Sequence, residues 1–277
     1  MTEISVVVPV GSQCAYLGEQ LYALATQKTA ASYEVLVVDN HPRVRQFDLP
    51  DGRFRVMHEP VVAGAAHARN VGAFRSGGDV ILFCDADDVV APGWIGGMSR
   101  AAARGLDVFG GPIDDVALDP LKQRGPTLPL PRDLDLMPWA IGANIGMRSS
   151  AFARLGGWNE AFRAGEEIDL CWRAQLLGLE FGEAPDALVH YRPRASARPA
   201  LFQGLSWGVA APRLLVEYGE HGLRRPSLPN ATRDWGRLLL AFPWLLVSPR
   251  ARRDAARLVG LRVGRMLGSL RWRRLLL

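Results

Sequence analysis

The segment DVILFCDADD at residues 79–88 constrains the fold of this chain most strongly. Its apolar run lacks alternation with polar residues, which is typical of a strand covered on both faces of a sheet. Three carboxylates follow within four positions, at Asp85, Asp87 and Asp88. Side chains alternate along an extended chain, so Asp85 and Asp87 are predicted to project the same way. Carboxylates held so close repel, and either a divalent cation or the water around a solvated turn must screen them.

Further apolar segments predict the rest of the sheet. The runs at residues 4–10 and 34–39 predict two more buried strands, and Asp39 ends the second. Helices are predicted within residues 14–27 and 61–76. This order predicts an α/β fold with a mostly parallel sheet flanked by helices. Such sheets bind ligands beyond the carboxyl ends of their strands, so one crevice is expected to hold Asp39 and the acidic segment.

Size and cysteine content set broader limits. A chain of 277 residues can form one large α/β domain with an appendage. The three scattered cysteines show neither metal spacing nor a disulfide framework, which favours a reducing compartment. The first predicted strand follows the N-terminus almost directly, so we do not expect export.

Short motifs follow one another along residues 4–192. With their first residue numbers they are VVPV (7), VVDN (37), GAAHARNVG (64), DADD (85), GAN (142), GGWNE (156), GEEIDL (165) and a late histidine, His190. In this order they make the chain resemble the family 2 inverting glycosyltransferases, which have the GT-A fold. The chain departs from the family in having Gly11 and Ser12 where Tyr-Asn is usual.

The resemblance implies a nucleotide diphosphate sugar as donor and Mg²⁺ or Mn²⁺ as cofactor. A carboxylate suits the imide N–H of uracil or thymine because it only accepts hydrogen bonds, so Asp39 favours UDP- or dTDP-linked donors. Arg69 is expected either to approach the diphosphate or to order the acidic segment, and the alternative is a surface arginine of the helix. His190 is expected to be a metal ligand or a diphosphate contact, and the alternative is a strand histidine satisfied by backbone. The expected donor contacts are Pro9, Val10, Asp39, Arg69 and Asp85, and the expected metal ligands are Asp87, Asp85 and His190.

A catalytic base is implied opposite the leaving diphosphate, because an acceptor hydroxyl is a poor nucleophile until its proton can leave. The family places an aspartate where this chain has Glu167, one methylene longer. Either Glu167 or its neighbour Glu166 is therefore the expected base. The resemblance places Asn144 and Trp158 on the acceptor side.

The C-terminal segment 233–277 has eleven arginines against two aspartates, a local charge of +9 in a chain of net charge +5. The first 232 residues therefore carry −4. Apolar residues spaced three and four apart from Ala256 to Leu270 predict a basic amphipathic helix in this tail. An anionic membrane surface is the expected partner, with packing on the catalytic domain or in a homodimer as the alternative. Nucleic-acid binding is not expected, because the apolar face is too continuous.

These expectations combine into an inverting, metal-dependent glycosyltransferase at the cytoplasmic face of the membrane. Its acceptor is expected to be a glycan or lipid-linked sugar of the cell envelope. A GT-A catalytic domain is expected over residues 1–200, with a nucleotide-binding half at 1–113 and an acceptor half at 114–200, and a helical extension over 201–277. Two alternatives stay open: a catalytically silent sugar-nucleotide-binding partner, and a sugar nucleotidyltransferase.

Overall fold

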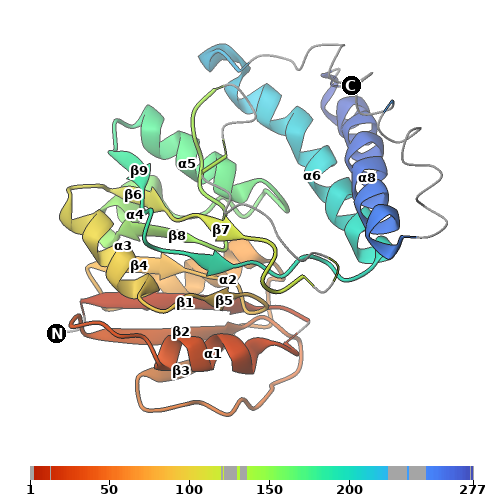
Figure 1. Ribbon diagram of the computed structural model, residues 1–277. Helices are drawn as coiled ribbons and strands as arrows, with labels where there is room; N and C mark the ends of the chain where they lie inside the picture. The colour runs from red at the N-terminus through yellow and green to blue at the C-terminus, as the bar shows by residue number, and fades with distance from the viewer. Residues whose placement is uncertain are drawn as a thin grey trace.

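The computed structural model describes residues 3–12, 14–119, 121, 130–131, 136–223, 236, 248–274 and 276. A central seven-stranded sheet has the order β3-β2-β1-β4-β8-β6-β9 (Figure 1). β8 runs antiparallel to its two neighbours, and the other pairs are parallel. The predicted mostly parallel α/β sheet is therefore confirmed. The strands are β1 Ile4–Val10, β2 Tyr33–Asp39, β3 Phe54–His58, β4 Val80–Phe83, β6 Val108–Gly110, β8 Ile145–Arg148 and β9 Phe181–Glu183.

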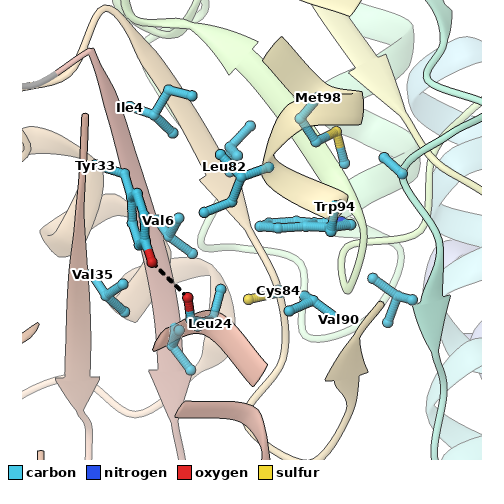
Figure 2. Close-up of a cluster of buried hydrophobic side chains, with 14 of the residues drawn as sticks. Ile4, Val6, Leu24, Tyr33, Val35, Leu82, Cys84, Val90, Trp94 and Met98 are labelled. Atoms are coloured by element: carbon cyan, nitrogen blue, oxygen red, sulfur yellow. Dashed lines mark hydrogen bonds between the residues drawn. The ribbon is translucent and has the colours of Figure 1, made fainter. Parts of the chain in front are cut away.

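Alternate residues of the central strands β1, β2 and β4 point into two separate apolar layers. Val6 and Val8 of β1 face the layer formed with α1 (Leu17–Ala25) and α3 (Trp94–Ala103), which Figure 2 shows around Trp94. Val7 faces the opposite layer. The helices of that layer are α2 Ala65–Phe74, α4 Ser149–Leu155 and α5 Glu166–Leu176. The absence of alternation in β1 follows from this double coverage.

A small second sheet with the order β5-β10-β7 lies beside the acidic segment. Its strands are β5 Val89–Val90, β7 Ile113–Asp114 and β10 Val189–His190. β10 pairs antiparallel with β5 and parallel with β7. Because β5 directly follows Asp88, this pairing brings the residues after His190 to the acidic segment.

The helices α6 (Ala197–Tyr218) and α8 (Pro249–Trp272) form a closely packed pair beside the sheet domain (Figure 1). The 3₁₀ turn η1, Gly219–His221, follows α6. The contact is made by backbone, because glycines of one helix face carbonyls of the other. A Cβ on Gly204 would lie 2.1 Å from the Arg257 carbonyl oxygen, and one on Gly260 would lie 2.1 Å from that of Leu201.

α6 is also attached to α5 by a buried aromatic contact. The rings of Trp172 and Tyr218 meet edge to face at 5.0 Å. The Tyr218 hydroxyl donates to Asp169 Oδ1 at 2.7 Å. These contacts connect the N-terminal part of α5, where the expected base lies, to the C-terminal end of α6.

We expect Gly204→Ala to lower the thermal stability of the protein, because the added methyl has no room against the α8 backbone. Overpacking of this kind costs about 1–3 kcal/mol, which corresponds to a fall in Tm of about 2–10 °C. Gly219→Ala is the matched control, since no atom lies within 4 Å of its added methyl. Equal Tm values for the two variants, measured by calorimetry, would contradict the observed helix packing.

The predicted tail helix is present, but its surroundings differ from the expectation that arginines simply surround its apolar face. Arg253 is buried and forms a bidentate ion pair with Asp119 at 2.8 and 2.9 Å. Val263, Met266 and Leu270 of the predicted apolar face are exposed, because the glycines occupy the contact with α6. Within the described residues, no helix is both long and apolar enough to cross a bilayer. Most of residues 233–247 lies outside the described residues.

Candidate active site

Three neighbouring parallel strands bring the expected donor residues to one edge of the sheet. Val10 at the end of β1 is in register with Asp39 at the end of β2, and Val7 is in register with Phe83 of β4. Asp85 follows β4 by two residues. Asp39 and the acidic segment therefore leave the sheet at the same edge, as predicted.

The acidic segment forms a cluster of three carboxylates. Ligand oxygens of Asp85, Asp87 and Asp88 all lie within 4.8 Å of one another. Burial raises the pKa of Asp87, Asp85 adds to the rise, and Arg194 opposes it. Burial and the two neighbouring carboxylates raise the pKa of Asp88 well above its usual value. Asp88 Oδ2 is buried without a hydrogen-bond partner. Oxygen ligands with an unfilled acceptor fit a hard divalent cation.

His190 was an expected metal ligand of this cluster, but two arginines, not His190, contact its carboxylates. His190 Nδ1 pairs with Asp114 Oδ2 at 3.1 Å, so the structure places His190 beside Asp114 and outside the carboxylate group. Arg194 Nη1 forms an ion pair with Asp87 Oδ2 at 3.0 Å. The backbone N–H of Arg192 donates to Asp88 Oδ1 at 2.7 Å. Positive charge from the segment after β10 thus partly neutralises the negative charge of the acidic cluster.

Asp39 is buried and already fully engaged. Arg45 forms an ion pair with it, and the His41 backbone N–H donates to Asp39 Oδ1 at 3.1 Å. Burial opposes ionisation of Asp39, but the hydrogen bonds from Arg45 and His41 outweigh it and lower its pKa. Arg45 also donates to the Gly11 carbonyl at 2.7 Å. A nucleobase can reach Asp39 only if Arg45 moves.

The other two expected donor contacts, Pro9 and Val10, are buried in β1. The Val10 carbonyl accepts a hydrogen bond from the Asn40 backbone N–H at 2.9 Å. That carbonyl therefore holds the ends of β1 and β2 together.

Arg69 of α2 joins the acidic segment to the start of α5. Its guanidinium donates to Asp85 Oδ1 at 2.8 Å and to Glu166 Oε1 at 3.1 Å. It stacks over the Trp158 ring, 4.7 Å from the centroid. Burial works against its charge, but Asp85 and Glu166 raise its pKa. Of the two expected roles of Arg69, this contact corresponds to ordering the acidic segment.

The two candidate bases begin α5, directly after Gly165 in a left-handed conformation. Glu166 is held by Arg69. Glu167 is half-buried, and burial together with the charge of Glu166 raises its pKa to about 8, against the opposing effect of Arg69. A carboxylate with a pKa this close to neutral is suited to taking a proton from a hydroxyl.

A cavity of about 410 Å³ connects these groups. Its sheet side holds Asp85, Arg69 and both glutamates, and α6 forms part of its wall. Asp39 does not line this cavity. The lining residues on the other elements are Ala65, Ile141, Gly142, Ala143, Arg163, Ala164, Gly165, Tyr191, Arg194, Pro199, Phe202, Gln203, Ser206 and Trp207.

The two residues expected on the acceptor side are buried and hold other parts of the chain. Asn144 accepts from Trp94 Nε1 at 2.8 Å and donates to the carbonyls of Pro112 and Ala187. Trp158 packs under Arg69 and against Phe83, with ring centroids 5.2 Å apart. The GAN and GGWNE motifs thus support the cavity wall with these two side chains, which do not line the cavity.

Several residues of the site were not predicted from the sequence. Arg45 and Arg194 pair with site carboxylates, and the α6 residues form a wall of the cavity. A readable signal existed for Arg194, because two arginines follow His190 within four positions. The α6 wall also had a sequence signal, because the spacing of its residues is typical of one face of a helix. These residues are Pro199, Phe202, Gln203, Ser206 and Trp207.

Two proteins with similar sequences are described as glycosyltransferases. A pre-mycofactocin glycosyltransferase of Mycobacterium tuberculosis is 27% identical over 236 residues, covering 78% of this chain and 48% of that protein. The chain therefore spans about half the length of this curated relative. An uncharacterised glycosyltransferase of Haemophilus influenzae is 36% identical over 91 residues, covering 32% of this chain and 31% of that protein.

The fold has a solved counterpart. A mannosyltransferase from Pyrobaculum calidifontis in complex with GDP-Man and Mn²⁺ matches with a TM-score of 0.56, at 16% identity, over 95% of this chain and 87% of that one. This likeness shows the GT-A fold. The family model described as glycosyl transferase family 2 matches residues 5–156. The chain belongs to glycosyl transferase family 2.

Proposed function

We propose that the protein is an inverting glycosyltransferase that moves a sugar from a nucleotide diphosphate to an acceptor hydroxyl. The observation that carries the proposal is the shared cavity. Asp85 of the acidic segment and Glu167 of α5 both line it, and buried Arg69 connects the two sides. A donor held at the acidic segment would place its sugar in front of the glutamates.

Glu167 is the base in this proposal. The acceptor hydroxyl gives its proton to Glu167, its oxygen bonds to the anomeric carbon, and the carbon–oxygen bond to the diphosphate breaks. The bonding electrons leave with the diphosphate, and a single displacement inverts the anomeric carbon. Glu166 is less suited to receive the proton, because Arg69 forms an ion pair with its Oε1. Its Oε2 is buried and accepts no hydrogen bond.

Asp85, Asp87 and Asp88 are the residues that would hold Mg²⁺ or Mn²⁺, as their oxygen-rich cluster and the unpartnered Asp88 Oδ2 support. The bound cation would neutralise charge on the departing diphosphate. Arg194 and Arg163 also line the cavity and are placed to bind the diphosphate oxygens. Arg194 would exchange its pairing with Asp87 for a phosphate oxygen.

The donor base is proposed to be uracil or thymine, provided that Arg45 releases Asp39. An imide N–H needs an acceptor, and Asp39 is the carboxylate at the end of β2. A guanine base would instead accept hydrogen bonds from Arg45 at its O6 and N7 atoms, a pairing that arginine commonly makes with guanine. The solved relative contains GDP-Man, so both classes belong in a donor test.

A donor panel tests the enzymatic proposal against a silent sugar-nucleotide-binding partner. UDP-, dTDP- and GDP-linked hexoses are incubated with the full chain and Mn²⁺, and released nucleoside diphosphate is measured beside thermal shift. Turnover of at least one donor supports the enzyme. A donor that raises Tm without any turnover, even with simple glycosides added, would identify a silent binder.

The outer face of α8 is proposed to bind the anionic inner face of the membrane, which would place a lipid-linked or envelope glycan acceptor nearby. Val263, Met266, Leu267 and Leu270 are exposed, the last by 78%, and Arg271, Arg273 and Arg274 are exposed beside them. Exposed apolar side chains on α8, with cationic side chains at and just beyond its C-terminal end, fit an anionic lipid surface.

We expect Leu270→Glu to weaken sedimentation with phosphatidylglycerol vesicles by about tenfold or more, because it removes an apolar contact and adds repulsion. Val61→Glu is the control, since Val61 is equally exposed far from α8 in the sequence. Equal vesicle binding by both variants, or binding to phosphatidylcholine alone, would contradict the proposal. A dimer that persists without vesicles would favour the homodimer instead.

A further inference from the structure

One face of α6 presents aromatic side chains to the cavity instead of to the core. Pro199, Phe202, Gln203, Ser206 and Trp207 follow the helical spacing of a face that is usually buried. Phe202 is 53% exposed and Trp207 is 41% exposed. Neither belongs to the apolar clusters that hold the described residues together. Packing of the apolar core therefore does not explain why these two rings are present.

The rest of α6 is fixed by other contacts, so the cavity face is held in a definite orientation. Gly204 and Gly208 pack on the backbone of α8, and Tyr218 anchors the C-terminal end to α5. Gln203 Nε2 donates to the Tyr191 hydroxyl at 3.1 Å. Burial raises the pKa of Tyr191 to about 12, so this hydroxyl stays protonated. Because this wall is already ordered, a ligand that binds to it loses little free energy to ordering side chains of the protein.

The position of the aromatic face relative to Glu167 indicates what binds there. Asp85 and Glu167 both line the cavity. In the proposed function the donor is held beside Asp85, and Glu167 contacts the hydroxyl that attacks. The α6 face lines the same cavity on an element outside the sheet domain's donor strands. Aromatic rings interleaved with the polar groups of Gln203 and Ser206 suit a flat ring with polar edges.

We propose that Phe202 and Trp207 form the acceptor subsite, and that the acceptor presents a six-membered ring with a flat C–H or π face and a hydroxyl at its edge. A pyranose and a phenol share this chemistry. The ring would stack on the aromatic face while its edge hydroxyl points to Glu167. The assignment of this ring as the acceptor rests on the proposed function.

The binding test uses saturation-transfer NMR on the full chain with three separate probes: methyl β-D-glucopyranoside, phenol and n-hexanol. One of the two ring probes is expected to bind the wild type, which distinguishes pyranose from phenol. Trp207→Ala and Phe202→Ala are each expected to weaken that binding about tenfold, with Trp207→Phe intermediate. Tyr22→Ala removes an exposed ring on α1 and serves as the control with unchanged binding. Preferential binding of n-hexanol, or ring binding that survives both alanine variants, would overturn the subsite.

A second measurement separates this inference from the proposed function. With a donor that turns over, the ratio of transfer to the bound ring over hydrolysis to water is expected to fall about tenfold in Trp207→Ala and to stay constant in Tyr22→Ala. An unchanged ratio in Trp207→Ala would overturn the acceptor role. Ring binding that depends on Trp207 without any donor turnover would instead leave the subsite standing as a ring-binding site and refute the glycosyltransferase proposal.

Discussion

Glu167→Gln is expected to lower kcat for sugar transfer by about 10³-fold, because glutamine cannot take the proton of the acceptor hydroxyl. General base catalysis typically contributes about 10²–10⁴-fold. Glu166→Gln is expected to cost much less, about tenfold, because Glu166 pairs with Arg69 and does not receive the proton. Single-turnover kinetics with saturating donor measure both variants. A larger loss in Glu166→Gln than in Glu167→Gln would assign the base to Glu166.

The pH dependence provides an independent check on this assignment. A general base acts in its ionised form, so kcat/KM of the wild type is expected to rise with pH up to the Glu167 pKa of about 8. The charge of Glu166 raises that pKa, so Glu166→Gln is expected to move the rising limb to lower pH. An unmoved limb in Glu166→Gln, or a wild-type limb near pH 4–5, would contradict the coupling of the two glutamates.

Removal of the cation, or Asp87→Asn in its presence, is expected to lower donor turnover by at least about 10²-fold. A bound cation stabilises the charge that develops in the transition state by several kcal/mol, and the loss of this stabilisation accounts for the expected fall in turnover. EDTA should abolish turnover and Mn²⁺ should restore it in the wild type. In Asp87→Asn, restoration should require far more Mn²⁺, because one of the three clustered carboxylates no longer carries charge.

Asp186→Asn is the matched control for this prediction. Asp186 is an exposed aspartate paired with Arg100, and it lies outside the acidic cluster. Its variant should keep the wild-type Mn²⁺ dependence. Mn²⁺ should also raise the Tm of the wild type and of the control but not that of Asp87→Asn, since a cation stabilises only the fold that binds it. Full turnover by the EDTA-treated wild type would refute the proposed metal dependence.

The sheet and its acidic edge could be predicted because both are local properties of the sequence. An unbroken apolar run such as β1 indicates coverage on both faces, and the clustering of Asp85, Asp87 and Asp88 follows from their adjacency in the chain. The start of α5 was predictable for the same reason, since acidic residues favour a helix N-terminus.

The tail shows where local pattern is insufficient. Apolar spacing predicted one face of α8, but the helix packs through glycines that carry no hydropathy signal. Arg253 looked like a solvated cation, yet its partner Asp119 lies 134 residues earlier in the chain. Contacts of this kind depend on which segments meet in space.

By itself the sequence determined the α/β class, the parallel strands and the carboxylates at their ends, because strand burial and side-chain alternation depend on neighbouring residues. Only the tertiary structure decided that Arg69 joins Asp85 to Glu166, that Arg45 covers Asp39, and that α6 completes the cavity. Each of these contacts joins segments distant in sequence, and the physical cause is charge or packing complementarity that appears only once the chain has folded.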